Sequence, residues 1–161
     1  MPDEQKSQGR IVAISTSKRK GIPKSNIDSV RLIENFGLEG DVHGGNWHRQ
    51  VSFLALESID SMRAKGLPNL RPGAFAENIT TEFIDIPHLT VGSRVRIGAE
   101  AELEITQIGK ECHDKCAIFF KVGDCVMPRE GIFAKVIAGG EIRIGDHVTV
   151  VQKSSHVPVA A

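Results

Sequence analysis

The sequence predicts a mainly β fold: a closed or nearly closed β-barrel with one or two short helices and long polar loops. Short runs rich in valine and isoleucine recur along the 161 residues, and 16 glycines punctuate them. Aromatic residues make up only 5% of the chain, so β-branched side chains must supply most of the core. Seven or eight such strands would leave exposed edges in an open sheet, and closure into a barrel removes those edges.

The first half of the chain is expected to alternate strands with polar loops. Strand character is found at residues 10–15, 27–33 and 51–56, and in the stretch that follows the polar loop beginning at Arg71. A short helix is expected at residues 57–65, with acidic residues early and basic residues late, as the helix dipole prefers. Gly66 and Pro68 then end this helix.

Two hairpins and a last strand are expected in the second half. The pairs of strands are 89–97 with 101–108, and 132–137 with 141–144, and the last strand is 147–152. All these elements fit a single domain at residues 9–152. Flexible tails are expected at residues 1–8 and 153–161.

The charge and hydropathy of the chain exclude several classes of function. Twenty basic residues balance twenty acidic ones, which argues against nucleic acid or an anionic membrane as a partner. No apolar run approaches the roughly 18 residues of a spanning helix, and the first residues lack the apolar core of a signal peptide. A cytoplasmic location is therefore expected. The motifs of nucleotide-binding loops, nucleophile-elbow hydrolases and zinc proteases are also absent from the sequence.

The cysteines are the most informative residues. Cys112, Cys116 and Cys125 are the only three in the chain, and they fall within fourteen residues, with His113 beside the first. Thiolate sulfur is a ligand for soft metals and a strong nucleophile, and the neighbouring basic side chains favour the thiolate. Two other interpretations stay open. The cysteines could be small buried side chains, or a cramped zinc site could use them together with His113.

Two glycine-containing loops are candidates for ligand binding. His43-Gly44-Gly45 precedes Arg49-Gln50, and this pattern suits an anion, because glycines admit backbone amides and arginine binds phosphate in bidentate fashion. The alternative is a loop whose glycines only turn the chain. Glu77 and Asn78 stand at a loop–strand junction, where their side chains can bond loop backbone. The basic segment 18–24 is either a solvated loop or an anion contact.

Six segments in a fixed order resemble the MOSC domain, the C-terminal domain of molybdenum cofactor sulfurases that also occurs as a free-standing bacterial protein. They are residues 37–45, 49–51, 73–79, 91–98, 107–112 and 140–146. The resemblance spans residues 9–151. It implies a MOSC-type barrel, similar to the pyruvate-kinase barrel, and a role with the molybdenum cofactor, a pterin dithiolene that carries a phosphate.

The resemblance also implies which residues form the site. Cys112 matches the cysteine that binds molybdenum or carries sulfur; Cys116 is the rival, and His113 is their neighbour. The pocket positions that face the cofactor are matched by His43, Gly44, Gly45, Arg49, Gln50, Glu77 and Asn78. The chain is too short to include the pyridoxal-phosphate domain of the sulfurases, so that cofactor is not expected.

The implied functions are sulfur or cofactor handling and reduction of N-hydroxylated small molecules. The alternatives are a non-catalytic cofactor or sulfur carrier for molybdoenzyme assembly and a zinc-binding interaction module. The corresponding partners are molybdopterin, molybdoenzyme-assembly proteins and a redox partner.

Overall fold

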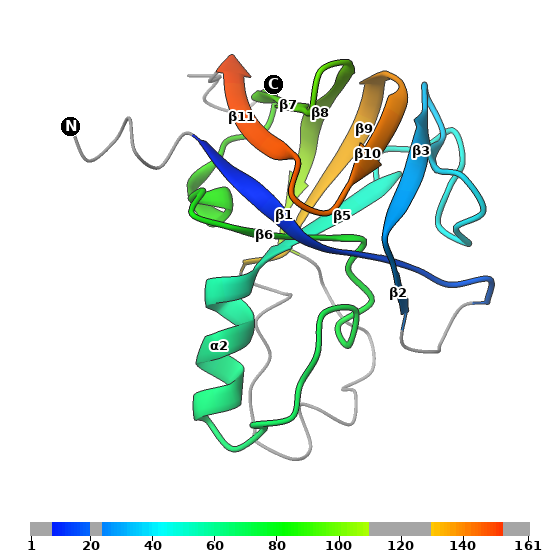
Figure 1. Cartoon of the computed structure of the whole chain (residues 1–161). Helices are drawn as coiled ribbons and strands as arrows, with labels where there is room; N and C mark the ends of the chain where they lie inside the picture. Colours follow the sequence, from blue (N-terminus) through cyan, green and yellow to red (C-terminus); the bar gives the residue numbers. More distant parts are fainter. Residues whose placement is uncertain (1–7, 20–23, 110–129, 153–161) are drawn as a thin grey trace, which may run out of the picture.

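Seven strands close into a barrel in the computed structural model, which describes residues 8–19, 24–109 and 130–152 (Figure 1). The barrel strands are β1 (Gln8–Thr16), β5 (Val51–Ala55), β6 (Ile79–Glu82), β7 (Arg94–Ile97), β8 (Ala101–Ile108), β9 (Ile132–Ala138) and β11 (His147–Gln152). Their order is β11-β7-β8-β9-β5-β6-β1, and pairing of β1 with β11 closes the ring. The predicted β-barrel is confirmed.

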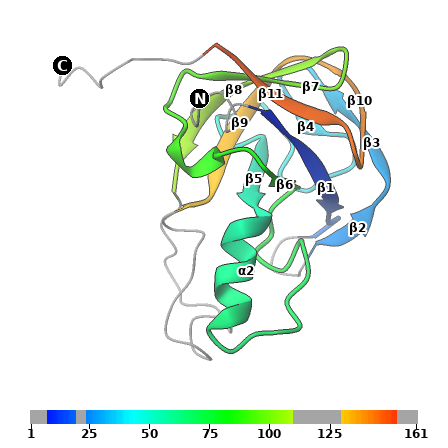
Figure 2. The same ribbon diagram turned by 60° about the vertical axis from the view of Figure 1, so that its left-hand side comes forward.

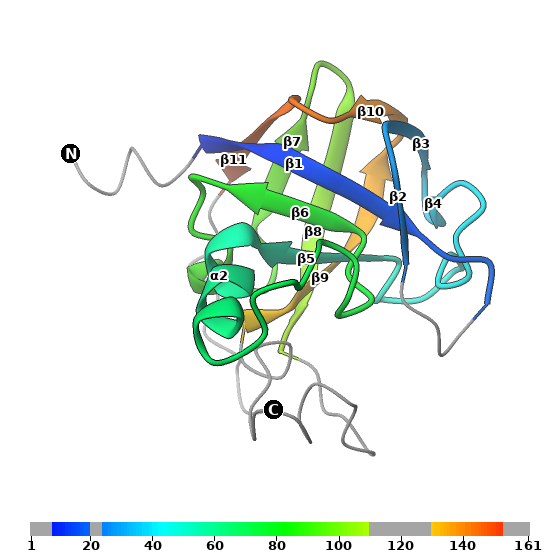
Figure 3. The ribbon, with the colours of Figure 1, turned by 60° about the horizontal axis from the view of Figure 1, so that its bottom comes forward.

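The pairing inside the barrel is antiparallel except at β5 and β6, which run parallel with Phe53 opposite Ile79. Figure 3 shows β1, β6 and β5 side by side in that order. Inward side chains from all seven strands fill the interior with hydrophobic residues, among them Ile14, Phe53 and Leu103, all fully buried. Burying one such side chain contributes about 1.5–3 kcal/mol to stability. Burial of the inward-facing side chains therefore favours closure of the barrel.

A smaller sheet lies beside the barrel and contains β10 (Gly140–Arg143), β3 (Ser29–Ile33) and β4 (Gly37–Leu38). The hairpin expected across residues 132–144 is therefore wrong, because β10 pairs with β3. The reason is that both edges of β9 are already occupied, one by β8 and the other by β5. One further short strand, β2 (Ser25–Ile27), pairs with the end of β1.

The hairpin of β7 and β8 is confirmed, with Ile97 opposite Ala101. Its first strand is much shorter than the expected 89–97. A 3₁₀ turn, η1 (Ile86–His88), and a bend at Gly92, whose φ is +93°, occupy the chain before Arg94. Glycine adopts this left-handed conformation without steric cost, so the strand begins only after the bend.

The α-helix α2 (Leu56–Ala64) follows β5 directly and lies on the outside of the barrel (Figure 2). It agrees with the expected 57–65 to within one residue. Its buried face packs Ile59 and Met62 against Leu54 and Phe133, which point outward from β5 and β9 and form a second, smaller core. No helix within the described ranges is long and apolar enough to cross a membrane.

Candidate functional site

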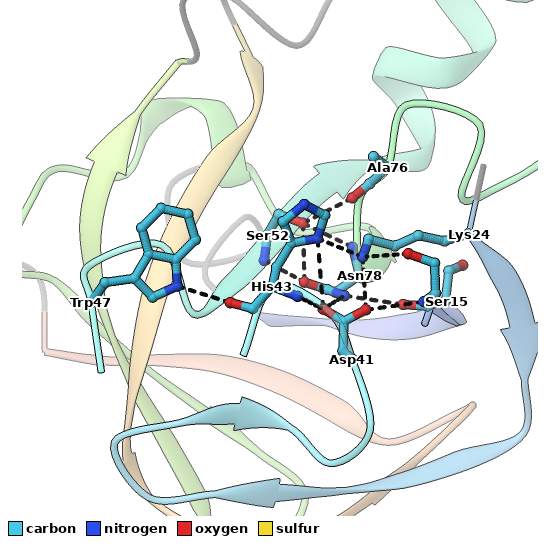
Figure 4. A network of polar contacts seen from close by, with 9 residues as sticks. Ser15, Lys24, Asp41, His43, Trp47, Ser52, Ala76 and Asn78 are labelled. Atoms are coloured by element: carbon cyan, nitrogen blue, oxygen red, sulfur yellow. Dashed lines mark hydrogen bonds and ion pairs between the residues drawn. The ribbon is translucent and has the colours of Figure 1, made fainter. Parts of the chain in front are cut away.

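Three segments that are distant in the sequence meet at one end of β1. They are the end of β1 itself, the 39–50 loop between β4 and β5, and the loop before β6. Val42 donates its backbone N–H to the carbonyl of Ser17 at 2.8 Å. Ser15 donates to the carbonyl of Asn78 at 2.7 Å, and Asn78 donates to that of Ser52 at 3.0 Å. These backbone bonds fix the positions of the polar side chains shown in Figure 4.

A fully buried ion pair lies at the centre of this junction. The ammonium of Lys24 is 2.7 Å from Oδ1 of Asp41, and neither side chain is exposed to solvent. Asp41 also accepts hydrogen bonds from the backbone N–H groups of Ser17 and His43 and from the side-chain amide of Asn78, at 3.1–3.2 Å. Burial of a carboxylate is tolerated only when it is paired and hydrogen-bonded in this way.

Lys24 corrects one expectation about the basic segment 18–24. Lys18 and Arg19 are exposed, as a solvated loop requires, but Lys24 is fully buried. The sequence contains no local signal for this pair, because the two partners are 17 residues apart. Lys24 and Asp41 are thus two site residues that the sequence analysis missed.

His43 connects the buried ion pair to the surface. Its Nδ1 is 2.8 Å from the ammonium of Lys24, and its side chain is 30% exposed. Its backbone carbonyl accepts a hydrogen bond of 2.8 Å from the indole N–H of Trp47 (Figure 4). The loop is tight here: a Cβ on Gly44 would collide with the ring of Phe36, so the glycine is required for packing.

Arg49, predicted to bind an anion, has its guanidinium over the ring of Trp47 at 4.8 Å and near that of Phe133 at 5.6 Å. Its Nε is buried and has no hydrogen-bond partner among the residues that the structure describes. In contrast, Arg94 on the outer face of the barrel forms ion pairs with Glu102 and Glu104. A half-buried guanidinium without a carboxylate or carbonyl partner is suited to bind an anion.

Gln50, the neighbour of Arg49, has both ends of its side-chain amide bound within the protein. It donates to Asn35 Oδ1 at 3.0 Å and accepts from the backbone N–H of Val136 at 2.9 Å. The side chain is fully buried. Gln50 therefore fixes the end of the 39–50 loop, next to Arg49, through these two hydrogen bonds.

Asn78 is likewise buried and bonded on all sides. Its Oδ1 accepts from the backbone N–H of Ser52 at 3.0 Å, and its Nδ2 donates to the carbonyl of Ser15 and to Asp41. One side chain thereby joins β1, β5 and the 39–50 loop.

Glu77 folds back on the loop that precedes it, as a structural role for this residue predicts. Its two carboxylate oxygens accept hydrogen bonds from the backbone N–H groups of Gly73 at 2.9 Å and Phe75 at 3.0 Å. Gly73 has φ of +97°, and a Cβ there would lie 2.8 Å from the carbonyl of Lys24. Burial raises the pKa of Glu77 above its ordinary value of 4.5, although these hydrogen bonds act in the opposite direction.

We expect the pKa of Glu77 to appear in the pH dependence of stability. A raised pKa means that the folded state binds this proton more tightly than the unfolded state does. The contribution of Glu77 to stability is therefore largest below the ordinary pKa of 4.5 and decreases as the pH rises above it. Urea denaturation of the wild type and of Glu77→Gln, which cannot titrate, should show the wild type losing stability relative to the variant across this range. If the stability of the wild type relative to Glu77→Gln stayed constant or increased as the pH rose, the raised pKa would be contradicted.

His48 ties the loop to the end of β8. Its Nε2 is 2.8 Å from Gln107 Oε1, and Gln107 donates to the carbonyl of Gly109 at 2.9 Å. Thr106 Oγ1 donates to the carbonyl of His48. The next residues along the chain carry the predicted thiol site, which lies outside the described residues: Cys112, His113, Cys116 and Cys125. Within residues 8–19, 24–109 and 130–152, no three metal-ligating side chains gather.

Comparison with known proteins identifies the family. The family model of the MOSC domain matches residues 39–149, more than half of the chain. The YuaD protein from Bacillus subtilis is 18% identical with a TM-score of 0.73, and the match covers 88% of this chain and 94% of that one. YiiM from Geobacillus stearothermophilus is 19% identical with a TM-score of 0.67, with coverage of 89% and 75%. YiiM from Escherichia coli is 19% identical with a TM-score of 0.65, with coverage of 92% and 72%.

The TM-scores of these three structures show a shared fold. A search of curated proteins finds no match. The barrel, its outer helix and the match over residues 39–149 agree with one another, and the chain belongs to the MOSC domain family.

Proposed function

We propose that this MOSC protein binds the molybdenum cofactor, with the phosphate of the pterin on Arg49 and the thiolate of Cys112 as the ligand to molybdenum. Membership of the family supports the cofactor as the ligand class. The observation that carries the proposal is the half-buried guanidinium of Arg49, which has no anionic partner among the described residues. A thiolate is proposed as the metal ligand because soft metal centres favour sulfur ligands.

The environment of Arg49 fits the phosphate part of the cofactor. The rings of Trp47 and Phe133 lie against the guanidinium and remove it from bulk water, which strengthens its interaction with an anion. Withdrawing a charged group from water without a partner is costly, so a bound phosphate would remove this cost. Arginine also matches the geometry of phosphate by donating two parallel hydrogen bonds.

The covalent chain supports the assignment of Cys112 to the same site. The side chain of Gln107 donates to the carbonyl of Gly109 and contacts His48. His48 directly precedes Arg49, the proposed phosphate ligand. Cys112 follows Gly109 by three residues in the sequence, and we propose that it belongs to the same site. When bound, the cofactor would supply redox or sulfur-transfer chemistry, while these residues bind and orient it.

Two activities fit this site: reduction of N-hydroxylated small molecules with an external redox partner, and sulfur or cofactor handling. The main alternative is a non-catalytic carrier for molybdoenzyme assembly, and turnover with a chemical reductant separates it from an enzyme. A zinc-binding interaction module is the third candidate, and it predicts stoichiometric zinc without a pterin.

The test is to purify the protein from a host that makes the molybdenum cofactor and to measure bound molybdenum, zinc and pterin. We expect molybdenum and pterin in the wild type and loss of molybdenum in Cys112→Ser. Cys116→Ser and Cys125→Ser are matched controls and should retain the metal, because Cys112 is the proposed ligand. Arg49→Gln should lower the pterin content, because an amide cannot neutralise the phosphate.

The other outcomes contradict the proposal in different ways. Loss of molybdenum in Cys116→Ser alone would move the metal ligand to Cys116. Zinc in place of molybdenum would favour the interaction module. A wild type that carries neither metal nor pterin would remove the cofactor from the function of this protein.

A further inference from the structure

The ring of Phe133 contacts both the second core and the loop that carries Arg49. Its side chain is buried in that core, with Leu54 from β5 and with Ile59 and Met62 from α2. The centroid of the same ring is 5.6 Å from the guanidinium carbon of Arg49. A core residue on the outer face of the barrel is therefore in contact with the side chain proposed to bind the anion.

Thr106 on β8 brings the backbones of the two residues together. Its hydroxyl lies within hydrogen-bonding reach of the carbonyls of His48 and Phe133, the second at 3.2 Å. His48 directly precedes Arg49 in the sequence. Phe133 is itself fixed in β9, which pairs with β5 on one side and with β8 on the other. The contact between Arg49 and Phe133 is thus set by the barrel strands.

The two rings that contact the guanidinium differ in their surroundings. Trp47, at 4.8 Å, comes from the same loop as Arg49, and 38% of it is exposed. Phe133 comes from a barrel strand, and only 6% of it is exposed. Side chains in a packed core are closely constrained by their neighbours, and a partly exposed side chain has fewer such constraints. Phe133 therefore ties the guanidinium to the more rigid part of the fold.

Hydrogen bonds of Nε do not explain why the guanidinium lies here. This nitrogen is buried and has no partner among the described residues. A long arginine side chain has several rotatable bonds, by which it usually turns its charged end into water. Aromatic rings attract the cation and so oppose this movement. A buried donor that is unpaired calls for an explanation, and a ligand that binds there supplies one.

We infer that Phe133 is a positioning residue that holds the guanidinium of Arg49 in place for the oxyanion. The inference rests on the proposed function, because the oxyanion is the phosphate that Arg49 is proposed to bind. Ligand binding immobilises a flexible side chain at a cost in entropy, and a side chain that is already held loses less. Phe133 acts through Arg49 and not as a ligand of the anion.

Three variants separate the ring of Phe133 from the packing of the core around it. Calorimetric titration with inorganic phosphate should show about fivefold weaker binding for Phe133→Leu, within the range for immobilising one arginine side chain. Phe133→Tyr keeps an aromatic ring and should bind phosphate like the wild type. The matched control is Ile59→Ala, which removes an aliphatic side chain from the same core. It should bind within about twofold of the wild type, because an aliphatic group makes no cation–π contact.

NMR tests the position of the guanidinium without any ligand. The Nε–H proton of Arg49 should exchange slowly with water in the wild type because the nitrogen is buried, and the neighbouring rings should shift its signal upfield. Absence of this signal in Arg49→Gln assigns it. We expect Phe133→Leu to speed the exchange and reduce the shift, and Ile59→Ala to preserve both.

The results distinguish this inference from the proposed function. Wild-type phosphate affinity in Phe133→Leu, or an equal loss of affinity in Ile59→Ala, would overturn the role of the ring, while loss of binding in Arg49→Gln would still support the phosphate subsite. An Arg49 signal that is unchanged in Phe133→Leu would overturn the inference by itself. A wild type that binds no phosphate would overturn the proposed function, and an altered Arg49 signal in Phe133→Leu would then still support the positioning of the guanidinium.

Discussion

Replacing Lys24 with methionine should lower the free energy of unfolding by about 3–5 kcal/mol, which is the usual cost of removing one partner from a buried ion pair. The carboxylate of Asp41 would stay buried with three hydrogen bonds, from Ser17, His43 and Asn78, but without a counter-charge. Methionine fills most of the volume of lysine, so the loss of stability would come from removal of the positive charge and not from a cavity. Urea denaturation of the purified variant measures this quantity directly.

Lys135→Met is the matched control. Lys135 is 3.9 Å from Glu104 on the outer face of the barrel, and 43% of its side chain is exposed. Exposed pairs of this kind contribute at most about 1 kcal/mol, so the control should unfold close to the wild type. The double variant Lys24→Met/Asp41→Asn should recover part of the loss, because it leaves no unpaired charge. A Lys24→Met variant as stable as the Lys135→Met control would show that the buried pair does not hold the loop.

The barrel could be predicted from the sequence because its strands carry local signals. Alternation of buried and half-buried residues marks β8, and the order of charges and the following glycine mark α2. What could not be predicted is which strand pairs with which. Residues 132–144 look like a hairpin, but the neighbours of β9 are chosen by the whole barrel, and β10 pairs with β3.

The candidate site was predictable to a similar extent. The glycine-rich loop with His43 and Arg49 has a recognisable composition, and the structure places both residues around Trp47. The buried pair of Lys24 and Asp41 has no such signal, because a lysine in a basic loop looks solvated until the chain is folded. Sequence patterns report which face of an element is apolar, whereas burial of a charge depends on a partner supplied from elsewhere in the chain.

Asn78 gives the second large effect. We expect Asn78→Leu to lower the free energy of unfolding by about 3 kcal/mol, because it leaves two buried backbone groups without partners, at about 1–3 kcal/mol each. These are the N–H of Ser52 and the carbonyl of Ser15. Leucine has the same branching of heavy atoms as asparagine and leaves no cavity, so we expect the lost hydrogen bonds to dominate. Ser52→Ala removes a hydroxyl in the same network and should cost only about 1 kcal/mol.

The stability of the double variant Lys24→Met/Asn78→Leu then tests whether Asp41 is the shared element. Both side chains donate to its carboxylate, Lys24 to Oδ1 and Asn78 to Oδ2. Residues in one hydrogen-bond network give non-additive effects, commonly by about 0.5–3 kcal/mol. A thermodynamic cycle built from urea denaturation should therefore show coupling above about 0.5 kcal/mol. Strict additivity would mean that the two residues stabilise the junction independently, and that Asp41 does not transmit the position of β1 and β5 to the loop that carries His43 and Arg49.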